Sequence, residues 1–443
     1  MLRVRRFALH WLGSAAGALL LGGCGDKAEL PLAAGFGPSP TLPAAHTSLI
    51  PTVLLTPAVG WPSGTRPTPA ADLQVSAYAT NLSHPRWLYV LPNGDVLVAE
   101  TGAPARPDDE SGISGFISKR AMQKVGAADP SAERITLLRG VDANGAAVTR
   151  SSFLSNLHSP FGMALVGTDF YVANTDAVLK FAYRPDTLRI DSPAVKVVDL
   201  PAGSRNHHWT KNLLASVDGA KLYVTIGSNS NVAENGMAAE HERACIWEVD
   251  LRNGAYTVFA SGLRNPNGLA WQPDSHALWT VVNERDELGS DLVPDYLTAV
   301  QAGAFYGWPY GYFGAHVDER VQPPRPDLLA TTRVPDYALG PHTASLGLAF
   351  ASGRLLPERW RNGAFVGQHG SWNRMPLSGY QVIFIPFVDG RPSGEPRVAL
   401  NGFVNAAGEA MGRPVGVAMD AQGALLVADD VGNTVWRLSP RPP

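Results

Sequence analysis

The chain has 443 residues, of which 45 are glycine and 36 are proline, and only 17% are charged. A formal net charge of -3 and the lack of a basic cluster in the body argue against a nucleic-acid surface. The length is sufficient for a large buried core, and abundant glycine, proline and aromatic residues are typical of an all-β protein with many turns.

The N-terminus carries the features of an export signal. Three arginines lie within the first six residues, an apolar stretch runs from Phe7 to Leu21, and the sequence LGGC ends at Cys24. The stretch is too short and too rich in glycine and alanine for a membrane span. We interpret residues 1–23 as a lipoprotein signal peptide and Cys24 as the lipidation site, with an ordinary secretory signal as the alternative. The protein is then expected to be exported and lipid-anchored to the bacterial cell envelope, facing the periplasm.

Residues 24–71 are rich in proline, alanine, threonine and glycine and show no helical or strand periodicity. This composition predicts a tether between the lipid anchor and a folded body at residues 72–443. With Cys24 lipidated, Cys245 has no partner for a disulfide. It lies in the apolar, strand-like run CIWEVD, which favours a buried, inert thiol over a nucleophile.

The body repeats one unit, which consists of an apolar segment, a turn and a second apolar segment. The six first segments are WLYV, GMAL, NLLA, GLAW, GLAF and GVAM. The six second segments are DVLVAET, DFYVANT, KLYVTIG, ALWTVVN, AFVGQHG and ALLVADD. Turns such as PNGD and VDGA have the residues of a tight hairpin.

Further strands follow these pairs. Third strands are expected at VLKFAY, CIWEVD, YQVIFIP and TVWRLS, and outer fourth strands at YTVFASG and RVALNGF. Six units of about four strands predict a six-bladed β-propeller. The strand LQVSAYA, which starts at Leu73, is expected to pair into the last blade and close the ring. Residues 102–149 and 317–343 are interpreted as long insertions.

Histidine or arginine precedes every inner strand at a nearly equivalent position. The first strand of a propeller blade lines the central channel, so the residues just before it are expected at the channel mouth. Loops that are merely polar would show mixed residue types, so this pattern favours a partly cationic funnel for an anionic or carbonyl-rich ligand. Arginines supply forked donors for carboxylates, and a histidine is suited to act as a general base. The residues are His84, His158, His208, Arg264, His342 and Arg413.

An acidic loop, NERDELGSDLVPDY at residues 283–296, follows the second apolar segment of the fourth unit. Its five carboxylates belong to Glu284, Asp286, Glu287, Asp291 and Asp295. Oxygen atoms at this density suit a hard cation such as Ca²⁺, although the spacing is not that of an EF-hand. A solvated acidic loop is the alternative, and the position near the ring favours the metal.

The aromatic segment FYGWPYGYFG, residues 305–314, is compatible with the wall of a flat ligand or with core packing. Several catalytic templates are missing from the chain: it has no GxSxG elbow, no HExxH, no Walker loop and no GxGxxG that opens a helix. Serine-hydrolase, ATP and NAD chemistry are therefore not expected.

The body also contains longer motifs, namely HHWTKNLLASVDGAKLYVTIGSNSN, GLRNPNGLAW, NERDELGSDLVPDYL, FYGWP and GAFVGQHGSWNR. Together they resemble the sorbosone dehydrogenase family, which is similar to the soluble glucose and aldose sugar dehydrogenases that use pyrroloquinoline quinone (PQQ). The likeness covers roughly residues 72–438. The six-bladed fold that it implies agrees with the count of repeats.

The resemblance implies roles for three residues near the channel. His208 would be the catalytic base, which takes the proton of a sugar hydroxyl while hydride passes to the quinone. Arg264, in the Arg-Asn-Pro motif, would polarise the quinone oxygen. Asn265 would hold the cofactor or the substrate oxygen. The neighbouring His207 is offset by one position and is expected to support the loop.

The resemblance also implies the remaining contacts of the cofactor and metal. Arg374 and Arg413 would meet the cofactor as cations, but a second arginine that often follows falls on Val415, so one charge is missing. The family holds Ca²⁺ partly through backbone carbonyls of a Glu-x-Gly-Pro loop. These positions fall here on Asp286 and Glu287, without the Gly-Pro pair, and Asp295 is a looser candidate ligand.

These features predict a sugar or sugar-aldehyde dehydrogenase that depends on PQQ and Ca²⁺. Its partners would be a small sugar substrate and an unidentified electron acceptor, a quinone or a cytochrome, and it would reach the membrane only through its lipid. A Ca²⁺-dependent sugar-lactone hydrolase is one alternative, against which the ring of histidine and arginine counts. A non-catalytic propeller that binds a partner protein or a cell-wall glycan is the other, which the missing Gly-Pro pair and Val415 keep open.

Overall fold

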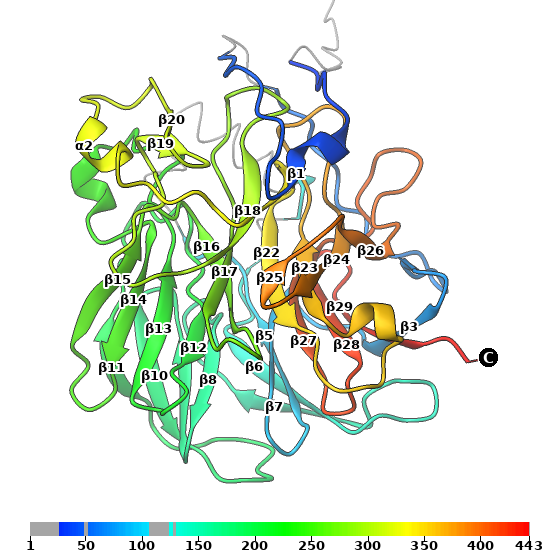
Figure 1. Ribbon diagram of the computed structural model, residues 1–443. Helices are drawn as coiled ribbons and strands as arrows, with labels where there is room; N and C mark the ends of the chain where they lie inside the picture. The colour runs from blue at the N-terminus through cyan, green and yellow to red at the C-terminus, as the bar shows by residue number, and fades with distance from the viewer. Residues whose placement is uncertain (1–25, 48–51, 106–123, 127–129, 443) are drawn as a thin grey trace, which may run out of the picture.

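The computed structural model describes residues 26–47, 52–105, 124–126 and 130–442 of the chain. Six antiparallel sheets stand around one axis as the blades of a β-propeller (Figure 1). The predicted all-β, six-bladed fold is confirmed. The predicted signal peptide, residues 1–23, and the predicted lipidation site, Cys24, lie outside the described residues.

The first three blades have four strands each, and the strands follow the chain from the axis outward. Blade 1 consists of β4 (Pro85–Val90), β5 (Val96–Glu100), β6 (Arg134–Arg139) and β7 (Thr149–Leu154). Blade 2 consists of β8 (Met163–Val166), β9 (Asp169–Ala173), β10 (Ala177–Ala182) and β11 (Val195–Asp199). Blade 3 consists of β12 (Leu213–Ala215), β13 (Lys221–Ile226), β14 (Cys245–Asp250) and β15 (Tyr256–Ser261).

The other three blades take strands from the N-terminal part of the chain. Blade 4 consists of β16 (Pro266–Trp271), β17 (Leu278–Val282), β18 (Pro294–Ala299), β21 (Tyr337–Pro341) and β1 (Phe36–Gly37). Blade 5 consists of β22 (Ser345–Phe350), β23 (Gly363–Gln368), β24 (Gln381–Val388), β26 (Arg397–Asn401) and β2 (Thr68–Pro69), and β25 (Arg391–Pro392) pairs with β24. Blade 6 consists of β27 (Pro414–Met419), β28 (Leu425–Asp429), β29 (Thr434–Pro440) and β3 (Leu73–Ala79).

The remaining elements are short. They are the pair β19 (Gly311–Tyr312) and β20 (His316–Val317), the single turn α2 (Pro326–Leu329), and the 3₁₀ turns η1 (Leu32–Gly35), η2 (Met237–Glu240) and η3 (Glu358–Trp360). Within the described parts of the chain, no helix has the length and apolar character needed to cross a membrane.

The predicted insertions contain strands that the repeat pattern did not reveal. Residues 102–149 include β6, the third strand of blade 1, and residues 317–343 include β21, the fourth strand of blade 4. The expected third and fourth strands elsewhere are present as β10, β14, β24, β29, β15 and β26. The long connections before β6 and β21 hide these strands, because the spacing between repeats no longer indicates where each pairing begins.

The ring closes as expected. Strand β3 pairs antiparallel with β29, so the first long strand of the chain is the outer strand of the last blade. The partners run from Ala79 opposite Val435 to Leu73 opposite Pro440. This pairing joins the two ends of the body and covers an edge that would otherwise be open.

The segment predicted as a tether contacts the propeller at several points along its described residues. Strand β1 extends blade 4 and strand β2 extends blade 5. Before β1, the amide of Ala28 donates to the carbonyl of Met375 at 2.8 Å, and between β1 and β2 the amide of Leu54 donates to the carbonyl of Trp372 at 2.7 Å. These backbone bonds attach the segment to the upper part of blades 4 and 5 (Figure 1). The domain boundary at residue 72 stays a prediction.

Glycine recurs in four of the inner-strand motifs because the inner strands crowd together at the axis. A Cβ atom at each of these positions would lie closer than 3.0 Å to an atom of the next blade around the ring, a separation that real Cβ atoms do not show. In blade 3 the equivalent residue is Asn212, whose side chain instead donates to the carbonyl of Asn267 in blade 4 at 2.9 Å. The four glycines are Gly162, Gly268, Gly347 and Gly416.

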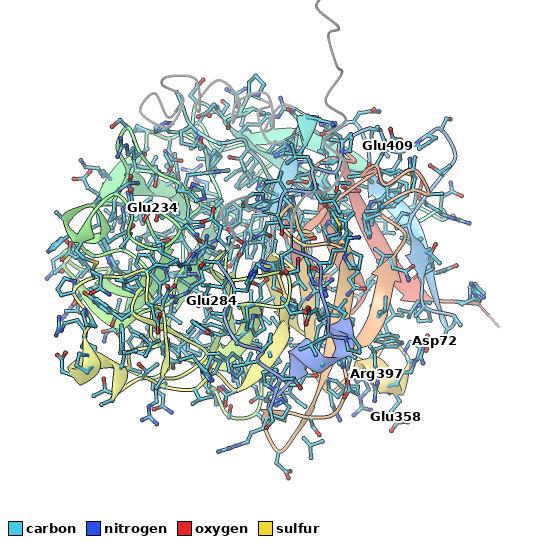
Figure 2. All side chains as sticks on the ribbon, turned by 90° about the horizontal axis from the view of Figure 1, so that it is seen from above. Asp72, Glu234, Glu284, Glu358, Arg397 and Glu409 are labelled. Atoms are coloured by element: carbon cyan, nitrogen blue, oxygen red, sulfur yellow. The ribbon has the colours of Figure 1, made fainter. Side chains whose placement is uncertain are left out.

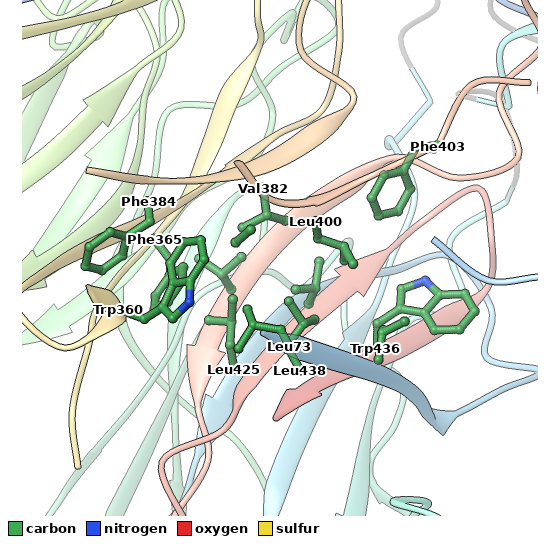
Figure 3. Close-up of a cluster of buried hydrophobic side chains, with 14 of the residues drawn as sticks. Leu73, Trp360, Phe365, Val382, Phe384, Leu400, Phe403, Leu425, Trp436 and Leu438 are labelled. Atoms are coloured by element: carbon green, nitrogen blue, oxygen red, sulfur yellow. The ribbon is translucent and has the colours of Figure 1, made fainter. Parts of the chain in front are cut away.

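Apolar side chains between neighbouring blades form the core. Figure 3 shows the cluster between blades 5 and 6, where Leu73 of β3 packs among Phe365, Leu425 and Leu438. Leu73 is fully buried, whereas the next residue, Gln74, is exposed. The alternation follows from the period of two residues along a strand. Strand β3 therefore contributes apolar packing as well as backbone pairing to ring closure.

We expect Leu73→Ala to destabilise the protein by about 2–5 kcal/mol, since it leaves a cavity at the junction where the ring closes. Urea unfolding measures this loss. Gln74→Ala on the same strand is the control and should change the free energy of unfolding by less than about 0.5 kcal/mol. Equal effects of the two substitutions would contradict a role for the buried face of β3.

Candidate functional site at the channel mouth

Antiparallel pairing brings two sets of loops to one end of the propeller. Within a blade, the start of the inner strand lies opposite the end of the second strand, as Pro85 does opposite Glu100 and Pro414 opposite Asp429. Residues just before inner strands and just after second strands therefore meet at the same edge. Seen from above, Glu284, which follows the second strand of blade 4, lies near the centre of the ring (Figure 2).

The six residues of the predicted ring differ in burial. One lies at the surface, because the side chain of His158 is 51% exposed and contacts Asp176 at 2.9 Å. His208 is half-buried. His158 therefore belongs to the solvated rim, and the other members are candidates for contact with a ligand. The four buried members are His84, Arg264, His342 and Arg413.

His208 is held in one orientation by the end of the second strand of blade 3. Its Nδ1 lies 3.0 Å from the carbonyl oxygen of Ser228 and 2.9 Å from the hydroxyl oxygen of the same residue. The carbonyl can only accept, so Nδ1 carries the proton and Nε2 is left as the proton acceptor. Burial, together with the charges of Arg264 and His207, holds the pKa of His208 well below its usual value of 6.5. The imidazole is therefore neutral at neutral pH, the form that a general base requires.

The backbone around His208 is also held by the side chain of Lys211. The ammonium group of Lys211 is buried and donates to the carbonyl oxygens of His208 and Trp209 at 3.2 and 3.4 Å. The ring of His207 lies against that of His208 at 4.8 Å in an edge-to-face arrangement, and His207 is exposed. His208 is therefore the more buried histidine of the pair.

The side chains of Asn265 and His208 both pack against Gly227. A Cβ atom on Gly227 would lie 2.5 Å from the Cβ of His208 and 2.6 Å from Oδ1 of Asn265. Asn265 is 5% exposed, and its Oδ1 has no hydrogen-bond partner among the described residues. A buried amide oxygen without a partner is costly, which marks Asn265 as a side chain available to a ligand. The structure thus brings the predicted base and the predicted cofactor contact together.

Arg264 is fixed by the loops around it. Its guanidinium donates to the carbonyl of Glu284 at 2.6 Å and to the side-chain oxygen of Asn231 at 2.9 Å. The carboxylate of Asp286 lies 3.4 Å away. These bonds hold a buried positive charge close enough to His208 to lower the pKa of its imidazole. The carbonyl of Asn231 also accepts from the indole of Trp308 at 3.0 Å, so this part of the aromatic segment 305–314 supports the site through a hydrogen bond.

The carboxylate of Asp286 is surrounded by donors. Asn373 donates to its Oδ1 at 2.6 Å, and Nδ1 of His342 lies 3.5 Å from the same oxygen. Burial alone would raise the pKa of Asp286, but hydrogen bonding to His342 and the charge of Arg264 lower it. His342 also contacts the carbonyl of Gly289 through Nε2 at 2.9 Å, so both of its nitrogens are engaged in holding the loop.

The predicted Ca²⁺ ligands do not converge on one cation. The carbonyl of Asp286 accepts from Asn231 at 3.3 Å and from Arg320 at 3.0 Å. Asp295 accepts from two backbone amides and one hydroxyl, and burial raises its pKa to about 6. The carboxylate of Glu287 is 53% exposed and lies 3.9 Å from Arg320. Oxygens that face donors do not fit a Ca²⁺ ligand set, so the atoms of Asp286 and Asp295 are unsuited to the predicted role.

Among the side chains that the structure describes, no group of three or more His, Cys, Asp or Glu residues is arranged to hold a metal ion. The metal role of Glu287 stays a prediction.

Arg374 links its own loop to the acidic loop at residues 283–296. It is buried and donates to the carbonyl of Pro376 at 2.8 Å and to the carboxylate of Asp291 at 3.3 Å. The other oxygen of Asp291 accepts from the amides of Glu29 and Leu30 at 2.6 and 3.0 Å. Arg374 therefore helps to anchor the N-terminal segment, and the contact with a cofactor that was predicted for it stays a prediction.

A second cluster, the Asp430 cluster, comes from blades 1, 5 and 6. The carboxylate of Asp430 accepts from Arg86 at 2.7 Å, contacts Nε2 of His369 at 2.9 Å and lies 3.6 Å from Nε2 of His84. The amide of Asp430 donates to the carbonyl of Arg413 at 3.3 Å, and the guanidinium of Arg413 lies 4.9 Å from the centre of the Tyr380 ring. Arg413 is 4% exposed, and its Nε and Nη2 have no hydrogen-bond partner in the described chain. These unmet donors fit the prediction that Arg413 meets an anionic group.

Four residues of the mouth are not indicated by the position before each inner strand, although the sequence contains a signal for them: Ser228, Asn231, His369 and Asp430. All four follow the ends of second strands, at VTIGS, VTIGSNSN, VGQH and VADD. Antiparallel pairing predicts that the end of a second strand lies at the same edge as the start of the inner strand.

The fold and the mouth define the class of this protein: a six-bladed β-propeller with a neutral, oriented histidine and buried arginines at one end of its axis. The chain belongs to the TrAA12-like family, whose model matches residues 132–296 and 329–441. A second family model, Glucose / Sorbosone dehydrogenase, matches residues 247–377 and confirms the resemblance noted in the sequence.

Two relatives show how far the likeness in sequence extends. An uncharacterized protein of Borreliella burgdorferi is 28% identical over 243 residues, which cover 54% of this chain and 62% of the relative. The aldose sugar dehydrogenase YliI of Escherichia coli is 30% identical over 111 residues, which cover 25% of this chain and 28% of the relative. The chain thus spans less than two thirds of the length of either relative.

Solved structures support the fold. The PQQ domain of pyranose dehydrogenase from Coprinopsis cinerea, in its holo form, superposes with a TM-score of 0.67 at 19% identity, over 84% of this chain and 97% of that one. The calcium structure of a family AA12 protein from Trichoderma reesei gives 0.68 at 18% identity, over 89% and 100%. The PQQ-bound aldose sugar dehydrogenase from Streptomyces coelicolor gives 0.53 at 15% identity, over 84% and 100%.

We expect Gly227→Ala to displace His208 outward, because the added methyl group would overlap its Cβ. The pKa of the His208 imidazole should then rise toward 6.5 as burial is lost. NMR titration of the imidazole resonances measures this shift, and the half-exposed His158 is the internal control. An unchanged titration of His208 would show that its side chain does not pack against Gly227.

Proposed function

We propose that this protein is a PQQ-dependent dehydrogenase that oxidises a sugar or a sugar aldehyde. The observation that carries the proposal is the pairing of His208, neutral and oriented by Ser228, with the fixed charge of Arg264 and the unpartnered oxygen of Asn265. Family membership, and the names of the proteins that share the fold, support the same chemistry.

Each residue has a distinct part in this proposal. Nε2 of His208 takes the proton of the substrate hydroxyl, and the bond from Nδ1 to Ser228 stabilises the imidazolium that results. Arg264 places positive charge where negative charge develops, and its bonds to Asn231 and Glu284 prevent it from moving away. Bound PQQ would supply the redox chemistry by accepting hydride from the substrate carbon.

The unpartnered atoms of the mouth are suited to hold this cofactor. Arg413 has two buried donors for a carboxylate, and Asn265 has a buried amide to fix a polar edge. Ca²⁺ is included in the proposal because of the resemblance to the sorbosone dehydrogenase family. Glu287, whose carboxylate is 53% exposed, is the proposed ligand from the 283–296 loop, since the carboxylates of Asp286 and Asp295 and the carbonyl of Asp286 already face donors.

The cellular setting is proposed on the sequence alone. We infer export through the signal at residues 1–23, lipid attachment at Cys24 and a periplasm-facing position on the bacterial envelope. Electrons would leave the protein to a quinone or a cytochrome.

Reconstitution tests the function directly. We expect the purified protein to bind PQQ when Ca²⁺ is present, and to reduce an artificial dye when aldoses and sugar aldehydes are added as a panel. Removing Ca²⁺ with a chelator should abolish dye reduction. A protein that binds no quinone and oxidises no sugar would refute the proposal, and quinone-independent hydrolysis of a sugar lactone would favour the hydrolase instead.

His208→Ala should lower kcat by about 100-fold or more, because a positioned general base contributes about 10²–10⁴-fold. Cofactor binding, followed by absorbance, should be retained. His207→Ala is the matched control on the adjacent exposed histidine and should change kcat only severalfold. A similar loss in both variants would mean that the loop as a whole, and not His208, carries the effect.

A further inference from the structure

The chain lacks one cation at the position where a second arginine was expected. Val415 occupies it in β27, and its side chain is fully buried in the blade. Arg413 alone therefore faces the mouth from this strand. An anion that needs more than one donor group must find the second on another blade.

Arg86 lies next to this position, since a Cβ atom on Gly416, the residue after Val415, would lie 2.7 Å from the carbonyl oxygen of Arg86. It belongs to β4 of blade 1, and its side chain is 13% exposed. Its Nη1 bonds to Asp430 at 2.7 Å, while its guanidinium lies 5.7 Å from the centre of the Trp209 ring. Trp209 directly follows His208 in the chain, so Arg86 lies between the Asp430 cluster and the loop that carries the proposed base.

The Asp430 cluster carries surplus positive charge. Arg86 and Arg413 contribute two charges, and Asp430 neutralises one of them. In the described chain, the neighbouring carboxylate of Asp429, whose pKa burial raises to about 6, accepts from the amides of Arg413 and Gly432 and from two indoles, and its hydrogen bonds do not include a guanidinium. Burial is unfavourable for this remaining charge, and it depresses the pKa of Arg86 together with the nearby charge of Arg413. Such a pair of arginines is stabilised by an anion that enters from the channel.

Several hydrogen-bonding atoms of the cluster are also unsatisfied. In the part of the chain that the structure describes, buried Nε of Arg86, and Nε and Nη2 of Arg413, have no hydrogen-bond partner, and neither has the acceptor Oδ1 of Asp430. Three donors on two guanidinium groups match the acceptors of one carboxylate. Ordered water is the other species able to satisfy them.

We propose that Arg86 is the second cation of the carboxylate-binding site, and that it supplies from blade 1 the charge that Val415 does not supply from blade 6. This inference rests on the proposed function, since the anion that it would bind is a carboxylate of the tricarboxylate PQQ. Asp430 is a positioning residue, which holds the guanidinium of Arg86 beside Arg413.

Equilibrium dialysis of PQQ against the full apo-protein tests the proposal. Arg86→Met should weaken binding about tenfold or more, the usual cost of a lost charge-assisted hydrogen bond. Arg86→Lys keeps the charge next to Asp430 but loses the forked geometry, so it should weaken binding less. The control is Arg437→Met, which removes a buried arginine paired with Asp420 on blade 6 at 2.7 Å and should leave binding unchanged.

The trimethyl ester of PQQ separates charge recognition from structural support. If Arg86 receives a carboxylate, the ester should bind the wild-type protein and Arg86→Met with similar affinity. Equal binding of PQQ by the wild-type protein and Arg86→Met, or an equal loss for PQQ and its ester, would overturn the proposal and favour ordered water at the cluster. A wild-type protein that binds no PQQ would overturn the proposed function itself, and this inference with it.

Discussion

Six inner strands share one axis, and the space between them leaves no room for a side chain at four of the repeated glycines. This crowding determines how the rest of the molecule is arranged. Because the inner strands are close, the loops that precede them converge at one end, and the second strands deliver their last residues to the same edge. A small number of polar residues from different blades are thereby brought together without any one segment having to contain a site.

The consequence is a mouth in which charge is buried and held in place. Arg264 and Asp286 stand on one side with Asn231, and Arg86 and Arg413 stand on the other with Asp430. Buried charges are tolerated only where they are paired or bonded, and most of these are. Within the described residues, the unpartnered atoms of Arg413 and Arg86, and that of the neutral amide of Asn265, are the features that most directly indicate a ligand. The neutral state of His208 has the same origin, since burial and neighbouring cations disfavour its charged form.

The N-terminal segment has a larger part in this arrangement than its composition suggests. It adds strands to blades 4 and 5, and the amides of Glu29 and Leu30 bind the carboxylate of Asp291, to which Arg374 is also bonded. A stretch rich in proline and alanine has few large apolar side chains, so its sequence shows no pattern that predicts burial. Its attachment depends on backbone N–H donors, which every residue other than proline possesses.

Sequence alone determined the all-β repeat, the number of blades, ring closure through LQVSAYA and the importance of the position before each inner strand, because these depend on local periodicity and turn residues. It also separated His208 from His207 by register. The tertiary structure decided which polar residues meet. Neither the strands β6 and β21, which lie within the long connections, nor the contacts of Arg86 with Asp430 and Trp209 follow from spacing along the chain. The same holds for Asp295. Its carboxylate suits a metal ligand by residue type, but its hydrogen bonds connect loops, and only the fold places donors around both of its oxygens.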